Sequence, residues 1–267
     1  MRFFIHIGYH GFHYRGWQRQ AGVMSVQETL ENVISKVLKT PTTIYGCGRT
    51  DARVSASQYF FHLDVTDPGE YDLLFRLNKV LPADIAIFDI IKVEEGQHAR
   101  FDASVRTYDY FIHTRKDPFL SEMSSLYQYD DLDWESIIKA RSLLTSYSDY
   151  RAFCKSPEKH RSTICKVTEA QWYRNKNGDR FRLRITSNRF LKSMIRILVG
   201  KFLEIGKGEF TVEQFENALR TKETPSLIIG AHPQGLYLSE VKYPYLEIKP
   251  RIDFSGIAGN EEWIRMS

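Results

Sequence analysis

The sequence predicts an α+β fold with two similar lobes, each built on a mostly antiparallel sheet with helices outside it. Segments rich in β-branched and aromatic residues alternate with segments of helical periodicity in both halves of the 267-residue chain. Capping signals and an Asn-Gly turn divide the chain into short elements. We expect the two sheets to join into one central sheet. The expected divisions are an N-terminal lobe at 1–105, a C-terminal lobe at 106–245 and a tail at 246–267.

The first half is predicted to hold four strands and two helices. Ser25-Val26-Gln27-Glu28 has the form of a capping box, and apolar residues recur after it at helical spacing until Lys39, before Pro41. Before this helix, residues 11–20 are predicted to form a loop that contains glycines, aromatic residues and arginines. Such a loop suits contact with exposed bases and phosphates. Alternatively, its aromatic residues cover a hydrophobic core. The strands are expected at 1–10, 42–45, 58–65 and 85–93, and the second helix at 71–80.

The second half repeats this alternation. Two strands at 163–173 and 180–186 form a predicted hairpin across Asn177-Gly178. Thr211-Val212-Glu213-Gln214 is a second capping box, which starts a helix ending near Arg220. We further expect strands at 107–113 and 236–242, an extended segment at 150–154, and helices at 133–144 and 190–205.

The net charge of +4 is spread unevenly along the chain. Residues 139–207 contain 17 lysines and arginines against 5 aspartates and glutamates, so this segment carries +12 and the rest of the chain −8. Such asymmetry is typical of a face that binds a polyanion. The interleaved Tyr, Phe and Trp residues could stack on bases, which favours nucleic acid over a merely solvated exterior.

Other features narrow the class of protein. The three cysteines, Cys47, Cys154 and Cys165, lack a Cys-x-x-Cys spacing, so we expect neither disulfides nor a zinc site, and a cytoplasmic location. The histidines show no ligand spacing, and no metal is expected. No apolar run approaches the roughly 20 residues of a membrane span, and the first residues suit a strand better than a signal peptide.

The most informative stretch is Gly48-Arg49-Thr50-Asp51-Ala52, between two predicted strands. A carboxylate in such a loop is held by backbone on both sides, and here Arg49 and Arg53 accompany it. This cluster of charges is costly near a core unless the charges are paired or meet a polyanion. We interpret Asp51 as the catalytic group of an enzyme acting on RNA, although the residue by itself would also suit the cap of a turn.

A set of motifs, in one order along almost the whole chain, resembles the tRNA pseudouridine synthase A family. Each motif is weak alone, and their common order is what carries the resemblance. They are Tyr9-His10-Gly11, Gly16-Trp17-Gln18-Arg19-Gln20, Ser25-Val26-Gln27-Glu28-x-Leu30-Glu31, Gly48-Arg49-Thr50-Asp51-Ala52, Leu77-Asn78-x-x-Leu81-Pro82, Ala99-Arg100-Phe101-Asp102-Ala103-x-x-Arg106-x-Tyr108-x-Tyr110, Phe190-Leu191-x-x-Met194-Ile195-Arg196-x-x-Val199-Gly200 and Gly235-Leu236-Tyr237-Leu238.

By this resemblance, Asp51 matches the family's essential aspartate and Arg196 the arginine that pairs with it. Tyr108 matches a tyrosine that stacks on the target base, and Leu236 an apolar residue that packs near the aspartate. Arg49 matches an arginine that helps to hold the target nucleotide out of its stack. The resemblance also implies a positively charged central cleft, no metal or cofactor, and a homodimer that isomerises uridines at positions 38–40 of the tRNA anticodon stem-loop.

The residues alone allow simpler roles for two of these side chains. On a helix, Arg196 shares a polar stripe with Arg189 and Lys192, which favours a solvated face. Tyr108 is followed two residues later by Tyr110, as in ordinary packing of a β face.

The chain departs from the family's usual pattern at three positions. The loop continues Ala52-Arg53-Val54-Ser55-Ala56 where the family usually has Ala-Gly-Val-His-Ala, and His10 replaces a usual aspartate. If the glycine position requires positive φ, Arg53 is strained or the loop is rearranged. The serine resembles a related eukaryotic branch that modifies other tRNA positions. We expect the chemistry to survive these changes, with Arg53 among the substrate-binding residues.

Three functions follow as hypotheses. The first is an active tRNA pseudouridine synthase, in which Asp51 serves as nucleophile or as base. The second is a catalytically impaired paralogue that binds tRNA as a chaperone, with Arg53 blocking the loop. The third is a glycosidase that releases free uracil.

Overall fold

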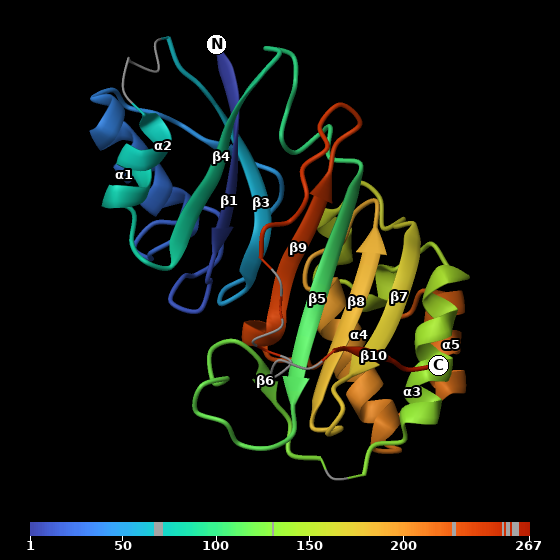
Figure 1. Ribbon diagram of the computed structural model, residues 1–267. Coiled ribbons are helices and arrows are strands. Elements are labelled where there is room, and N and C mark those ends of the chain that lie inside the picture. The colour runs from blue at the N-terminus through green and yellow to red at the C-terminus, as the bar shows by residue number, and fades with distance from the viewer. Residues whose placement is uncertain (67–71, 130, 226–227, 253, 255–256, 258–261) are drawn as a thin grey trace. The chain divides into compact units, whose positions relative to one another are not determined.

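The computed structural model describes residues 1–66, 72–129, 131–225, 228–252, 254, 257 and 262–267 (Figure 1). The chain divides into two compact units. The first comprises Met1–Arg106 and Tyr237–Asp253, and the second comprises Thr107–Leu236 and Phe254–Ser267. Residues 237–245, which the sequence analysis assigned to the second lobe, therefore pack with the first unit.

The first unit is built around a sheet with the strand order β9-β3-β1-β4. β1 pairs antiparallel with both β3 and β4, the short β2 pairs antiparallel with β3, and β9 pairs parallel with β3. Helix α2 packs against β4 and against α1. The elements are β1 (Arg2–Tyr9), α1 (Val26–Leu38), β2 (Tyr45–Gly46), β3 (Ser55–Asp64), α2 (Leu73–Val80), β4 (Ile85–Val93) and β9 (Leu236–Lys242). The first residue of β9, Leu236, is assigned to the second unit, and the rest of the strand belongs to the first.

β3 is the central strand of the first unit. Nine of its ten residues are buried, and these include the polar side chains of Ser55, Ser57, Gln58 and His62 as well as the apolar run at 59–61. Helix α1 begins where the side chain of Ser25 accepts the backbone N–H of Glu28. It ends at Lys39, whose φ of 55° stops the helical path.

The second unit is built around a sheet with the strand order β10-β7-β8-β5, and β6 pairs parallel with β5. Helix α3 packs against α4, α5 and β7. The elements are β5 (Val105–His113), which starts at the end of the first unit, β6 (Ser125–Leu126), α3 (Trp134–Ser142), β7 (Val167–Arg174), β8 (Arg180–Ser187), α4 (Met194–Gly206), α5 (Val212–Thr221) and β10 (Ile264–Arg265), with 3₁₀ turns at Leu143–Thr145, Arg151–Phe153, Pro157–Lys159 and Pro233–Gly235.

Aromatic side chains fill the core of the second unit. Trp172 of β7 is fully buried and makes edge contacts with Trp134 of α3 and Phe202 of α4. Phe215 of α5 packs on Phe202 in turn, with ring centroids 5.5 Å apart. These rings hold the three helices on the sheet, since large buried aromatic residues contribute most of the apolar area of a core.

The α+β class and the mostly antiparallel strand pairing are confirmed. Several local expectations were wrong. Of the strand expected at 42–45, only Tyr45 lies in β2, and the first hairpin strand starts at Val167 rather than at 163. Residues 151–153 form a 3₁₀ turn rather than an extended segment, and the helix expected from 190 starts at Met194. It starts late because Ser193 has φ of 57°, which no helix residue can adopt. Residue 71, the expected start of α2, lies outside the described residues. No helix in the described part of the chain has the length and apolar character needed to cross a membrane.

Candidate active site

Asp51 lies in a tight turn between β2 and β3. Its carbonyl oxygen accepts the N–H of Val54 at 3.2 Å, which closes a four-residue turn. The third residue of this turn, Arg53, has φ of 64°, so the position does require the conformation that glycine adopts most easily. The turn is formed with the arginine in place, and its N–H donates to the Tyr14 carbonyl at 3.0 Å.

The backbone on either side of Asp51 is fixed by the preceding loop and by β3. The carbonyl of Thr50 accepts the N–H of Trp17 at 3.3 Å, and the hydroxyls of Thr50 and Tyr9 are hydrogen-bonded at 2.9 Å. The phenol of Tyr59 donates to the Gly48 carbonyl at 2.6 Å. Such a loop presents its carboxylate on a preorganised backbone, as catalysis requires.

Glycines let the loop at 10–20 approach the Asp51 loop closely. A Cβ on Gly11 would lie 2.0 Å from the carbonyl oxygen of Val54, and one on Gly16 would lie 2.5 Å from that of Thr50. Both distances are far shorter than any real Cβ contact, so only glycine fits at these two places. This close approach explains why the family motifs at 9–11 and 16–20 contain glycine at these two positions.

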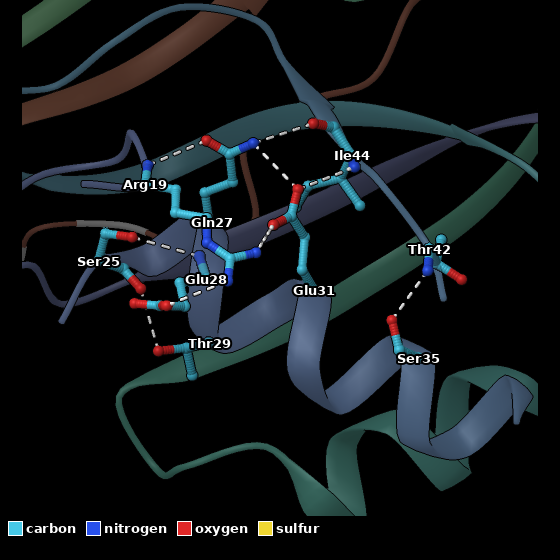
Figure 2. Close-up of polar contacts among 9 residues, drawn as sticks. All are labelled: Arg19, Ser25, Gln27, Glu28, Thr29, Glu31, Ser35, Thr42 and Ile44. Carbon is cyan, nitrogen blue, oxygen red and sulfur yellow. Dashed lines mark hydrogen bonds and ion pairs between the residues drawn. The ribbon is translucent and has the colours of Figure 1, made fainter. Parts of the chain in front are cut away.

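A polar network at the start of α1 holds the strand segment that leads into the Asp51 loop (Figure 2). The carboxylate of Glu31 is almost buried and accepts the N–H of Ile44 at 3.3 Å and the side-chain amide of Gln27 at 3.0 Å. The same Gln27 amide donates to the Ile44 carbonyl at 3.2 Å. Arg19 supplies the balancing charge, with its Nη1 3.3 Å from Glu31 Oε2. The buried carboxylate is therefore paired.

Arg106 is a further anchor to which the sequence analysis gave no role. Its Nη2 donates to the carbonyl of Cys47 at 2.8 Å and to that of Arg100 at 3.1 Å, while Nη1 donates to the Ala103 carbonyl at 3.1 Å. The guanidinium thus joins the residue just before the Asp51 loop to the segment between β4 and β5. Its place in one of the family motifs marked the residue, but not this anchoring role.

The other two predicted residues of this loop are exposed. Arg49 is at the surface, and Arg53 holds its guanidinium 4.8 Å from the centre of the Phe12 ring. Ser55, by contrast, is buried and accepts the Gly11 N–H at 2.9 Å. It also shares a hydrogen bond with Tyr237, the residue it faces on β9, and burial raises the pKa of that tyrosine. Ser55 therefore stabilises the loop packing and does not point outward.

The remaining predicted residues lie in the second unit. Tyr108 is half-buried on β5 and meets Phe190 edge to face, with ring centroids 5.1 Å apart. Arg196 is also half-buried. Its Nε donates to the Ala231 carbonyl at 2.7 Å, and the Ala231 N–H donates to the Arg196 carbonyl at 2.8 Å. A fully solvated stripe is thus wrong for Arg196. Leu236 is buried, as its apolar character suggested.

The structure therefore brings Asp51, Arg49 and Arg53 together in one loop of the first unit and places Tyr108, Arg196 and Leu236 in the second. The pairing of Asp51 with Arg196 stays a prediction. Within the described residues, no group of three or more His, Cys, Asp or Glu side chains could hold a metal ion.

Comparisons with known proteins identify the family. A family model described as tRNA pseudouridine synthase matches residues 146–244. A protein of Parabacteroides distasonis named tRNA pseudouridine synthase A is 38% identical over 247 residues, covering 91% of this chain and 96% of the relative. Proteins of the same name from Porphyromonas gingivalis and Bacteroides fragilis are 37% and 36% identical, each over 91% of this chain and 97% and 96% of their own lengths.

The similarity to these relatives spans nine-tenths of the length of the chain. The likeness is too extensive for a shared fold alone. The chain belongs to the tRNA pseudouridine synthase A family.

Proposed function

We propose that the protein isomerises uridine to pseudouridine in the anticodon stem-loop of tRNA, with Asp51 as its catalytic group. The observation that carries the proposal is the Asp51 turn, whose backbone is held by Trp17 on one side and by Tyr14 on the other. A rigid turn of this kind keeps a carboxylate in one place while the substrate is brought to it. The relatives named tRNA pseudouridine synthase A support the choice of tRNA as substrate.

The reaction breaks the N1–C1′ bond of uridine, turns the freed base and joins C5 to C1′, and a proton leaves C5 as N1 gains one. An ionised aspartate could attack C1′ or remove a proton from the sugar, so Asp51 serves as nucleophile or base. The target base must leave its stack, and an aromatic surface must hold it while it is detached. In our proposal Tyr108 is that surface, and Leu236 packs beside the site.

The arginines have three proposed roles. Arg196 pairs with the Asp51 carboxylate. Arg49 helps to hold the target nucleotide out of its helix, and its exposed position at the Asp51 loop suits this role. Arg53 contacts the RNA backbone, since its guanidinium is exposed over the Phe12 ring.

The test is the formation of pseudouridine in an unmodified tRNA transcript, mapped chemically at single-nucleotide resolution. The wild-type protein should modify uridines of the anticodon stem-loop, and Asp51→Asn should abolish the product while retaining tRNA binding. Asp131→Asn, which removes a carboxylate at an exposed position of the second unit, is the matched control and should keep full activity. Absence of pseudouridine with wild-type protein would reject the proposal.

The alternative, an impaired paralogue that binds tRNA, also predicts binding that weakens with salt, so binding alone does not separate the two. Turnover does. The structure favours an active enzyme because Arg53 fits the turn without displacing it. Release of free uracil would instead indicate a glycosidase.

We also propose that the protein is a cytoplasmic homodimer, as the family resemblance implies. The three buried, unpaired cysteines are compatible with a reducing compartment. Sedimentation of the purified protein at micromolar concentration tests the dimer, and a monomer mass would exclude it.

A further inference from the structure

The segment between β4 and β5 carries residues 99–103, the first part of a motif of which the proposed reaction uses only Tyr108. Its most conspicuous residue is Phe101, whose ring is 75% exposed in the first unit. Exposure of a large aromatic ring to water is unfavourable, and a cluster of such rings marks a binding surface more often than a single one does.

Phe101 belongs to such a cluster. Its ring centre lies 4.2 Å from that of His98, and the His98 ring lies 6.3 Å from that of Tyr45, which is itself 51% exposed. The guanidinium of Arg100 lies 5.8 Å from the centre of the Phe101 ring. We call these four residues the aromatic cluster. It joins ring faces to a cation, the combination that suits bases and phosphates.

The backbone of the cluster is fixed, although its rings are exposed. His98 Nδ1 accepts the N–H groups of Arg100 and Phe101 at 3.0 and 3.4 Å. The carboxylate of Asp102 accepts the His98 N–H at 2.7 Å and the Tyr245 hydroxyl at 2.8 Å. Because Nδ1 accepts two N–H groups, the His98 ring is neutral, and its Nε2 carries the proton. A preorganised surface of this kind loses little entropy when a ligand covers it.

Arg106 places the cluster beside the catalytic loop. One nitrogen of its guanidinium, Nη2, donates to the Cys47 carbonyl at 2.8 Å and to the Arg100 carbonyl at 3.1 Å, so both backbone oxygens lie close to a single atom. Cys47 comes four residues before Asp51. Both segments belong to the first unit.

We propose that the aromatic cluster is a stacking site for an unpaired base of the substrate RNA, next to the nucleotide that reacts. The inference rests on the proposed function, since that function supplies the RNA. The base covers Phe101, and Arg100 meets the adjoining phosphate. An RNA occupant is favoured over a second copy of this chain because Arg100 adds positive charge beside the exposed Phe101 ring, and the Asp51 loop that Arg106 ties to this segment carries Arg49 and Arg53.

The test compares Phe101→Ala with Phe119→Ala by fluorescence anisotropy with a labelled, unmodified tRNA at fixed salt. Phe119 is 87% exposed in the second unit, so its loss is a matched removal of one exposed ring. Phe101→Ala should weaken tRNA binding about tenfold, the size expected for one stacked base. Phe101→Tyr should restore binding to within about twofold, because its ring still stacks. Phe119→Ala should leave the Kd unchanged.

A fully paired RNA duplex of similar length is the second probe. It offers no unpaired base, so Phe101→Ala and wild type should bind it equally. Equal tRNA binding by the two alanine variants would overturn the inference, as would a loss that is the same for duplex and tRNA. A change in sedimentation without a change in Kd would instead assign the cluster to a protein contact. These measurements do not depend on turnover, so they remain decisive even if no pseudouridine forms.

Discussion

At the scale of single residues, Gly16 and Gly22 both have positive φ, at 95° and 75°, but only Gly16 is crowded. A Cβ on Gly16 would lie 2.5 Å from the Thr50 carbonyl oxygen, whereas one on Gly22 would meet nothing within 4 Å. Gly16→Ala should therefore lower the free energy of unfolding by about 3 kcal/mol, and Gly22→Ala by about 1 kcal/mol. Urea unfolding of both variants measures this difference.

The same pair separates stability from function. Thr50 precedes Asp51, so Gly16→Ala should also slow pseudouridine formation at least about tenfold, because a small displacement of a catalytic group is costly. Gly22→Ala should keep the wild-type rate. If both variants slowed the reaction equally, the close approach at Gly16 would not position the catalytic loop.

Some residue-scale features could be predicted from the sequence. The positive φ at Arg53 followed from a glycine expected at that position, and the burial of Leu236 followed from its type. The anchoring by Arg106 could not be predicted, because its partner Cys47 is 59 residues away and its bonds go to carbonyl oxygens, which every residue has. The sequence does not show which backbone carbonyl a side chain will bind, because every residue has one.

At the scale of elements, Asp109, the residue after Tyr108, ties β5 to β8. The Asp109 carboxylate is fully buried and is paired with two arginines of β8, Arg182 Nε at 2.6 Å and Arg184 Nη1 at 3.3 Å. Asp109→Asn should lower the free energy of unfolding by about 3 kcal/mol, because it removes the charge of a fully buried carboxylate that is paired with both arginines. Chemical denaturation followed by tryptophan fluorescence measures the loss.

Glu135→Gln is the control for this prediction. It breaks the ion pair between Glu135 and Lys139 on α3, whose side chains are both largely exposed. Exposed pairs contribute little, so the unfolding midpoint should stay where it is in wild type. A similar loss in both variants would show that Asp109 is no more important than a surface charge.

The element boundaries show where sequence patterns suffice. The last strand was expected at 236–242 and β9 has those bounds, because an apolar run after a Pro-Gln-Gly turn has few other solutions. The start of α4 was missed because Phe190 and Leu191 continue the apolar periodicity, while the irregular conformation of Ser193 has no signal in residue type. Local pattern predicts what an element is better than where it starts.

At the scale of the whole molecule, the order of motifs identified the family, and composition indicated a polyanion as ligand. The sequence could not predict that residues 237–253 return to the first unit. That return depends on the pairing of β9 with β3, and on the Gln58 side chain, which accepts the Val241 N–H at 2.8 Å and donates to the Ile248 carbonyl at 3.1 Å. Such contacts join positions more than 180 residues apart.

Buried histidines should make the whole protein sensitive to mild acid. Burial lowers the pKa of His6, His62 and His113, and that of His62 falls to about 4. Unfolded histidine has a pKa of about 6.5, so between pH 6.5 and 4 the unfolded chain binds more protons than the folded one. The free energy of unfolding must then fall as the pH falls through this window. His62 alone should account for about 2 kcal/mol between pH 7 and 5.

Urea unfolding at pH 7 and pH 5 measures this loss, and His62→Asn identifies its source. The Nδ1 of His62 accepts the Ala99 N–H at 3.2 Å, a bond that protonation would break and that an Asn side-chain oxygen can replace. His62→Asn should therefore lose about 2 kcal/mol less than wild type over the same pH interval, whatever its stability at pH 7. If His62→Asn kept the wild-type pH dependence, protonation of His62 would not be what destabilises the folded state, and the acid sensitivity would have to come from other groups.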